Sequence, residues 1–293
     1  MNDSTRTQAP NLTDEFAATS EIVVPLMAHD RHEPALSVAH NLAQRWNLGI
    51  HIVHVRLPDD PVDNDRLEAI RSAFSQRFPG TDTSSTLVSG EQIAEALAPI
   101  IPPTALTIMR SMHADQGGIA SIAGSILRAI AGPALIIGPN ADYEDLSRPV
   151  VVALDGSPTA ERAIDCAVAF AASIGQRLQL VQVIDPSTSA HVARLRSDGQ
   201  RVAESGYLQS VADRLLASGH NVGWEVIHGT DVVRGLLSAV QHLGGGVVVL
   251  GTHGDSGIAR RMLGSTAMGL VATSVSPVLV VVTAGRDEPE LTA

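Results

Sequence analysis

The chain has 293 residues, a length that suggests about two domains of ordinary size. Its formal net charge of −11 and pI near 5.4 argue against nucleic acid or a membrane surface as a partner. Hydrophobic residues make up 44 % and aromatic residues only 3 %, which predicts aliphatic cores of buried parallel strands covered by alanine-rich helices.

The cysteine content and the first residues of the chain are compatible with a cytoplasmic protein. The single cysteine, Cys166, excludes an intrachain disulfide, fits a reducing cytosol and is expected to be a small core residue. Residues 1–20 lack the apolar segment of a signal peptide, and no run of 18 apolar residues predicts a membrane span. Residues 1–19 and 285–293 are predicted to be flexible tails.

Taken in chain order, the sequence contains two copies of the same structural unit. Residues 22–24 predict a first strand, an alanine-striped helix follows, and residues 50–55 predict a second strand. Residues 150–152 and 178–183 repeat this plan without a gap. More polar helical segments follow, around 63–78 in the first copy and 189–218 in the second.

The remaining elements also come in pairs. They are third strands at 86–88 and 225–227, helices at 91–98 and 230–242, fourth strands at 105–109 and 247–250, and fifth strands at 134–137 and 278–282. This alternation predicts an α/β fold of two tandem repeats, each a five-stranded, mostly parallel sheet with helices on both faces. The predicted domains are 20–140 and 146–284, joined by a linker at 139–148.

The glycine-rich stretch from Gly251 to Thr266 carries the strongest functional signal. It follows the Val-rich fourth strand of the second copy and leads into a helix. A strand, a glycine loop and a helix N-terminus together favour phosphate binding. The spacing is neither that of a P-loop nor that of G-x-G-x-x-G. Asp155 follows the first strand of the same copy, so both segments are predicted at the carboxyl edge of one sheet.

The spacing Gly-x2-Gly-x9-Gly-Ser and the phrase Val-Ala-Leu-Asp-Gly-Ser at 152–157 resemble the ATP-binding motif of the universal stress protein family, in its tandem two-domain form. The resemblance covers about 20–284, is strong only in the second copy, and implies a Rossmann-like fold of the adenine nucleotide alpha hydrolase type. It implies that Asp155 faces the adenine and ribose, and that the backbone of Val183 contacts adenine. Phosphate and ribose contacts would come from Gly251, Gly254, Gly264, Ser265 and Thr266.

Each of these residues also has a plainer interpretation. Asp155 would cap the helix that begins at Pro158, and the glycines would simply form turns. His253 is either a solvated loop residue or a polar contact to the ligand. Arg260 and Arg261 either shield the triphosphate or only solubilise the loop. Because the chain is acidic, tight triphosphate binding requires such a local cation or Mg²⁺.

The first copy has lost most of the motif in an ungapped overlay. Gly264 and Ser265 fall on Gly124 and Ser125, and the final helix is expected to be about one turn shorter. The other counterparts are Met27 for Asp155, Ser111 for Gly251, Ala114 for Gly254, Ala120 and Ser121 for the two arginines, and His113 for His253. We therefore expect a structural or regulatory half without ATP, or one with a different ligand contacted by His29 and His113.

Three classes of function remain. The first is a stress sensor or regulator that acts through nucleotide-dependent conformation or an unidentified protein partner, as the resemblance implies. The others are a slow ATPase, with His253 as the base, and a nucleotide-free scaffold. Dedicated catalysis is not expected, because no nucleophile–base pair or carboxylate cluster is evident.

Assembly is predicted from the fifth strands. Residues 134–137 and 278–282 are apolar on both faces, and an exposed edge of that kind promotes aggregation. We expect these strands to pair within the chain as a pseudo-dimer, with each strand buried in its own half as the alternative. A further homodimer of two chains is compatible with the sequence, which does not define its surface.

Overall fold

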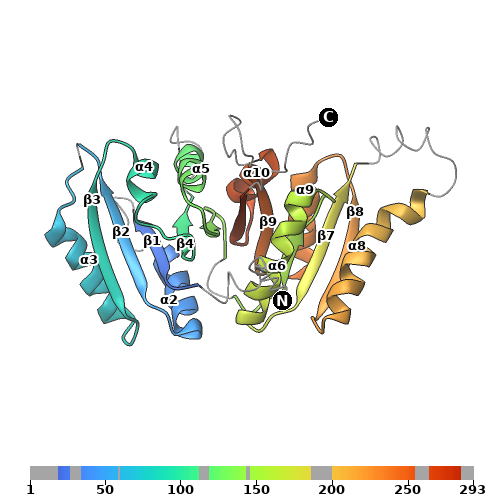
Figure 1. Ribbon diagram of the computed structural model, residues 1–293, viewed down its shortest axis with the longest axis horizontal. Coiled ribbons are helices and arrows are strands. Elements are labelled where there is room, and N and C mark those ends of the chain that lie inside the picture. The colour runs from blue at the N-terminus through green and yellow to red at the C-terminus, as the bar shows by residue number, and fades with distance from the viewer. Residues whose placement is uncertain are drawn as a thin grey trace, which may run out of the picture.

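The computed structural model describes residues 19–26, 34–58, 60–111, 119–142, 146–185, 200–254 and 264–284. The predicted tails therefore lie almost wholly outside the described residues, as does part of the linker. Within the described ranges, ten strands alternate with eight α-helices (Figure 1). No helix in these ranges combines the length and apolar character that a membrane crossing requires.

The two halves repeat the same order of elements. The first half consists of β1 (Ile22–Leu26), α2 (Pro34–Trp46), β2 (Ile50–Arg56), α3 (Asn64–Arg77), β3 (Thr83–Ser89), α4 (Ile93–Leu97), β4 (Leu106–Arg110), α5 (Ile119–Ala129) and β5 (Ala134–Ile137). The second half consists of β6 (Val150–Ala153), α6 (Pro158–Ser173), β7 (Leu178–Ile184), α8 (Gln200–Ala217), β8 (Val222–His228), α9 (Val232–Leu243), β9 (Val247–Gly254), α10 (Ser265–Thr273) and β10 (Val278–Ala284).

All ten strands belong to one sheet, in the order β3-β2-β1-β4-β5-β10-β9-β6-β7-β8. Neighbouring strands are parallel within each half, and the halves meet where β5 and β10 pair antiparallel, with Leu279 opposite Leu135. This confirms the predicted α/β fold and the predicted pairing of the fifth strands within the chain. The two five-stranded sheets are thus halves of one continuous sheet.

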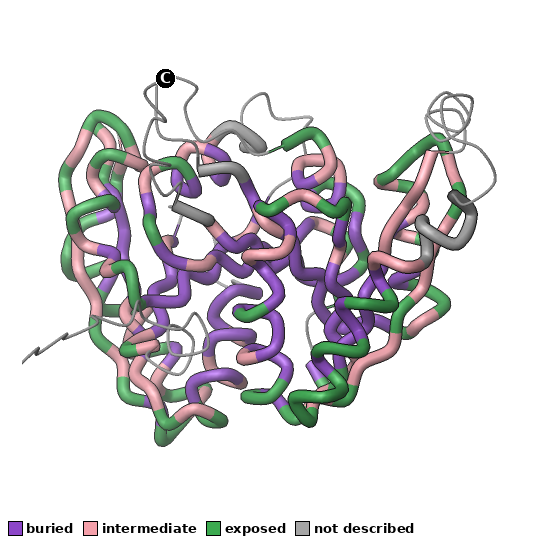
Figure 2. The backbone as a smooth tube through the Cα atoms, turned by 45° about the vertical axis from the view of Figure 1, so that its right-hand side comes forward, coloured by how far each residue is buried: buried purple, intermediate pink, exposed green. Residues whose placement is uncertain are grey.

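Two apolar layers cover the sheet, and each runs through both halves. Side chains of α2, α3, α6 and α8 pack on one face, and side chains of α4, α5, α9 and α10 pack on the other. Figure 2 shows the buried backbone passing through the middle of the molecule, with exposed residues toward the periphery. Cys166 is buried in the first layer, as expected for a small core residue.

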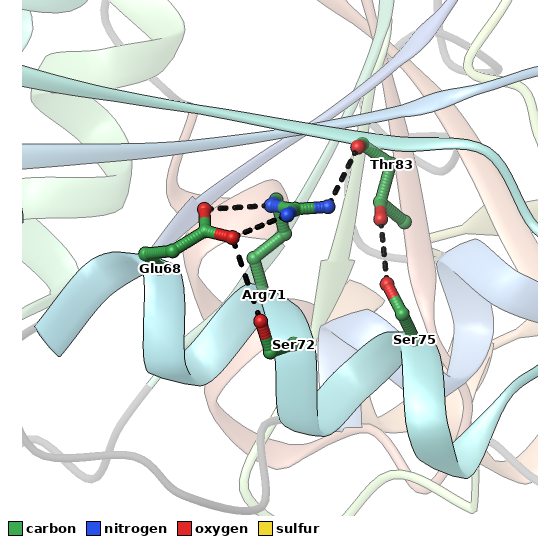
Figure 3. A network of polar contacts seen from close by, with 5 residues as sticks. All are labelled: Glu68, Arg71, Ser72, Ser75 and Thr83. Atoms are coloured by element: carbon green, nitrogen blue, oxygen red, sulfur yellow. Dashed lines mark hydrogen bonds and ion pairs between the residues drawn. The ribbon is translucent and has the colours of Figure 1, made fainter. Parts of the chain in front are cut away.

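Polar contacts supplement the apolar packing of α3 at the outer end of the sheet. This helix buries only Leu67 and Phe74. Figure 3 shows Arg71 paired with Glu68 while its guanidinium donates to the carbonyl oxygen of Thr83 at 3.4 Å. Exposed pairs of this kind contribute little to stability, so they orient α3 more than they stabilise it.

The fourth strand of the second half is longer than the sequence predicts. β9 continues through Gly251 to Gly254, because β10 pairs with it over its whole length, up to Ala284 opposite Gly254. A cross-strand partner outweighs the weak strand preference of glycine. The motif glycines therefore begin within a strand rather than after one.

Candidate functional site

The candidate site lies where the order of the strands reverses. β6 is flanked by β7 on one side and β9 on the other, and the helices that follow β6 and β9 pack on opposite faces of the sheet. Open α/β sheets bind ligands at such a point, beyond the carboxyl ends of the strands. α10 connects the parallel strands β9 and β10, so it runs back against them and begins at this carboxyl edge.

A tight turn presents Asp155 at the end of β6. Its carboxylate Oδ1 accepts a hydrogen bond from the backbone N–H of Ser157 at 2.9 Å. Gly156 has a φ of +82°, a conformation that strongly favours glycine. Ser157, and not Asp155, caps α6, because its hydroxyl accepts from the N–H of Ala160 at 3.1 Å. Asp155 itself is exposed, so its carboxylate is open to a ligand.

Gly251 is explained by packing within the protein. A Cβ at this position would lie 2.5 Å from the carbonyl oxygen of Thr159 in the first turn of α6. Only glycine allows that turn to rest on β9 without a shift. At Gly251 the backbone of β9 therefore comes close to the backbone of α6. This contact also brings the Asp155 turn, which precedes α6, next to the end of β9.

Gly264 has no such packing partner. It is the N-cap residue of α10, with φ −60° and ψ 157°, and as a glycine it has no side chain with which to cap the helix. No described atom lies within 4 Å of the Cβ that another residue would place there. Ser265 is exposed and Thr266 is half-buried in the same first turn. Among the residues that the structure describes, the positive end of the α10 dipole therefore has no side-chain cap at the carboxyl edge.

The other predicted residues are placed only in part. The Val183 side chain packs against Gly235 of α9, where an added Cβ would lie 2.9 Å from it. The backbones of His253 and Gly254 belong to β9 and pair with residues 283 and 284 of β10. Arg260 and Arg261 lie outside the described residues, as does the His253 side chain.

Sequence reasoning missed Tyr207 and Glu161. Tyr207 of α8 packs on the core layer of α6, and its hydroxyl oxygen is buried without a hydrogen-bond partner among the described residues. Burial, the nearby Glu161 carboxylate and, more weakly, Asp155 raise the pKa of Tyr207 far above its usual value of 10.0. The signal was slight, because Tyr207 stands in no motif and is notable only as one of two tyrosines in the chain.

Strand pairing corrects the overlay of the two halves. Leu106 of β4 and Val247 of β9 lie opposite the first residues of β1 and β6. Counting four residues onward from each leads to Arg110 in the first half and Gly251 in the second. The counterpart of Gly251 is therefore Arg110, and not Ser111 as the ungapped overlay predicts. The first half carries a large cationic side chain where the second half requires glycine.

The final helices correct the overlay further. α5 has 11 residues and α10 has 9, so the expected shorter helix in the first half is wrong. Both helices end four residues before the proline that precedes the fifth strand, at 133 and 277. Counted back from these prolines, Gly264 corresponds to Ala120, whereas Gly124 lies inside α5. The difference in length falls in the loop before the helix, and in the first half it is Gly118 that directly precedes the helix in the sequence.

The first half closes its own carboxyl edge with a buried histidine. His54 of β2 is 3 % exposed, and its ring nitrogens lie 2.9 Å from the carbonyl oxygen of Leu26 and 2.8 Å from Oδ2 of Asp60. Asp60 Oδ1 in turn accepts from the N–H of Val62 at 2.9 Å. The segment after β2 is thus tied to the end of β1. The counterpart of His54 in the second half is Gln182, whose Oε1 is buried and has no partner in the described part of the chain.

Comparisons with known proteins agree with this architecture. The model of the universal stress protein family matches residues 147–282. A universal stress protein of Mycobacterium tuberculosis is 28 % identical over 152 residues, which cover 45 % of this chain and 47 % of that protein. The chain thus spans about half the length of the curated relatives it matches.

Solved structures extend the likeness to both halves. A universal stress protein from Archaeoglobus fulgidus superposes with a TM-score of 0.66 at 18 % identity, covering 90 % of this chain and 98 % of its own. A functionally unknown protein from Pseudomonas aeruginosa gives 0.62 at 16 % identity, covering 91 % and 94 %. At these identities the likeness concerns the fold alone.

The fold is that of a doubly wound α/β protein with two tandem Rossmann-like halves. In the second half, the carboxyl edge of the sheet has the arrangement at which such sheets bind ligands. The family match covers that second half, and the structural likeness covers both. The second half of the chain, residues 147–282, is thus similar to the universal stress protein family.

Proposed function

We propose that the second half binds one adenine nucleotide, ATP, at the carboxyl edge of β6 and β9, and that the protein acts as a stress-response sensor or regulator. The observation that carries this proposal is the uncapped N-terminus of α10 at Gly264, on the same edge as the Asp155 turn. The predicted residues then divide into a phosphate end and a nucleoside end.

The phosphate end consists of the first turn of α10 and the loop before it. Backbone N–H groups at a helix N-terminus bind anions, and the exposed hydroxyl of Ser265 adds a donor. Gly264 leaves the space beside this turn open. Because the net charge is −11, the triphosphate also needs cations, which we assign to Arg260 and Arg261 or to Mg²⁺. Gly254 and His253 lead into this loop at the end of β9.

The nucleoside end consists of Asp155 and the end of β7. The exposed carboxylate accepts hydrogen bonds, and the hydroxyl and amino groups of adenosine donate them. At Val183 the backbone provides the contact to adenine, because the side chain is already packed against α9. The first half differs at this edge, since Met27 and Arg110 are the counterparts of Asp155 and Gly251, and His54 closes the edge. It is proposed as a structural or regulatory partner.

A regulatory output is supported by what α10 contacts at its other end. A Cβ at Gly138, just after β5, would lie 2.6 Å from the carbonyl oxygen of Val271 in α10. The N–H of Asp142 donates to the carbonyl oxygen of Val275 at 2.7 Å. A ligand at the start of α10 therefore acts on a helix whose end rests on the first half and the linker. Such a contact provides a route to a conformational response or to a protein partner.

Calorimetric titration of the full chain with ATP tests the proposal. We expect a stoichiometry near one; a value of two would show that the first half binds nucleotide, and no binding would favour a scaffold. Asp155→Asn keeps an oxygen for the N–H of Ser157 but removes the charge, so it should weaken binding without unfolding the turn. Asp231→Asn is the matched control, because Asp231 accepts from a backbone N–H at the start of α9. Nucleotide that copurifies as ADP would favour the slow ATPase.

A further inference from the structure

The hydroxyl of Tyr207 is a buried polar group that the fold leaves without a hydrogen-bond partner among the described residues. An unpaired buried hydroxyl destabilises the folded state, and phenylalanine would fill the same space without that cost. The ring packs on the core layer that α6 and α8 share, next to Leu208, which is fully buried. Packing accounts for the aromatic ring but not for the hydroxyl.

Two carboxylates lie near this hydroxyl. Glu161, in the first turn of α6, and Asp155, at the end of β6, both act on Tyr207, and Arg214 of α8 opposes them. Tyr207 thus connects α8 with the edge at which the nucleoside end of the site is proposed. No hydrogen bond of ordinary geometry joins Tyr207 to Glu161 among the described residues, but Glu161 acts on the hydroxyl more strongly than Asp155 does.

Two carboxylates at one edge select a particular ligand chemistry. Ionised carboxylates only accept hydrogen bonds, so their partner has to donate them. The vicinal 2′ and 3′ hydroxyls of ribose are such donors, and acidic side chains recognise them in other nucleotide sites at carboxyl edges. A phosphate on the ribose would be repelled.

On the basis of the proposed function, we infer that Glu161 and Asp155 accept hydrogen bonds from the ribose hydroxyls, with Tyr207 as the positioning residue that holds Glu161. The site thereby selects ribonucleotides over their deoxy forms. Ligand binding draws the carboxylate of Glu161 onto the Tyr207 hydroxyl, which then gains its missing partner. α8 becomes part of the nucleotide site through this one side chain.

The test compares ATP with 2′-deoxy-ATP and 3′-deoxy-ATP by calorimetric titration of the full chain. The wild type should prefer ATP over at least one deoxy form by roughly tenfold, the value of about one hydrogen bond. Tyr207→Phe keeps the ring and removes the hydroxyl, so it should weaken ATP roughly 3- to 10-fold and leave the deoxy form nearly unchanged. The preference of the protein for ATP over the deoxy form would then be lost.

Two further variants serve as a second test and as a control. Glu161→Gln should reproduce the loss of preference, and it carries the test if Tyr207→Phe does not fold. Ser210→Ala is the matched control, because Ser210 is exposed on α8 and its hydroxyl donates to the backbone carbonyl oxygen of Tyr207, at 2.7 Å. It should leave both affinities unchanged.

Each outcome decides between the two proposals. Equal weakening of ATP and deoxy-ATP by Tyr207→Phe would make Tyr207 a structural residue and overturn the inference. A wild type that binds both forms equally would also overturn it, while leaving nucleotide binding intact. If no nucleotide binds to the wild type, the proposed function fails, and this inference fails with it.

Discussion

Gly264→Val separates the phosphate site from the stability of the fold. The residue has φ −60° and ψ 157°, which valine adopts without strain, and no described atom lies within 4 Å of its Cβ position. Its replacement should therefore change the free energy of unfolding by less than about 1 kcal/mol. If phosphates lie against this N-cap, the valine side chain occupies their place. ATP affinity should then fall at least tenfold, or about 1.4 kcal/mol.

Gly251→Ala is the opposite case and serves as the comparison. Its Cβ would lie 2.5 Å from the carbonyl oxygen of Thr159, so α6 or β9 must shift. Such overpacking costs about 1–3 kcal/mol. Urea unfolding without ligand and calorimetric titration with ATP, run on both variants, give the two numbers. Wild-type ATP affinity in Gly264→Val would refute the phosphate site at α10, and wild-type stability in Gly251→Ala would refute the packing explanation.

Three further predictions concern the loop, the join and a surface pair. Replacing Arg260 and Arg261 together by alanine should weaken ATP more than AMP in titrations, because only the longer phosphate chain reaches them; equal losses would make them surface groups. Val280→Asp places a charge in a fully buried strand at the join, so protease cleavage in the linker should become faster; unchanged resistance would contradict this. The Glu225 carboxylate and a backbone carbonyl raise the pKa of His242 above 6.5, so Glu225→Gln should lower its titration midpoint by NMR. The pair stabilises the fold below the unfolded pKa, and this small contribution is lost as the pH rises through the folded pKa.

The strands and the join between the halves were predictable because the chain repeats itself. Apolar runs and alternating helices predict every strand, and the apolar fifth strands predict their own pairing, in which the structure places Leu279 opposite Leu135. Strand ends were less predictable, since β9 extends past Gly251 only because β10 pairs with it. Such pairing partners are distant in sequence and leave no local signal at the strand end.

The site was only partly predictable, for two physical reasons. A motif indicates residues that follow one another in the chain, as Gly251 and Gly264 do, but it does not indicate whether packing or a ligand requires each glycine. The structure separates these two cases. Tyr207 and Glu161 come from different helices, and only the packing of α8 against α6 brings them together. The ungapped overlay misplaced Gly124 because the extra residues of the second half lie in a loop.

The antiparallel join also has a consequence during synthesis. β5 pairs with β4 inside the first half, but its other edge remains unpaired until β10 has been synthesised. Val278 of β10 pairs with Ile136 of β5, and it lies 278 − 136 = 142 residues later in the chain. At about 5–20 residues per second, the ribosome needs roughly 7–28 s to make that stretch. For this time the nascent first half presents an apolar, unpaired strand edge, the kind of surface that promotes misassociation with neighbouring chains. Chaperone protection on the ribosome is therefore expected to matter most between the emergence of β5 and that of β10.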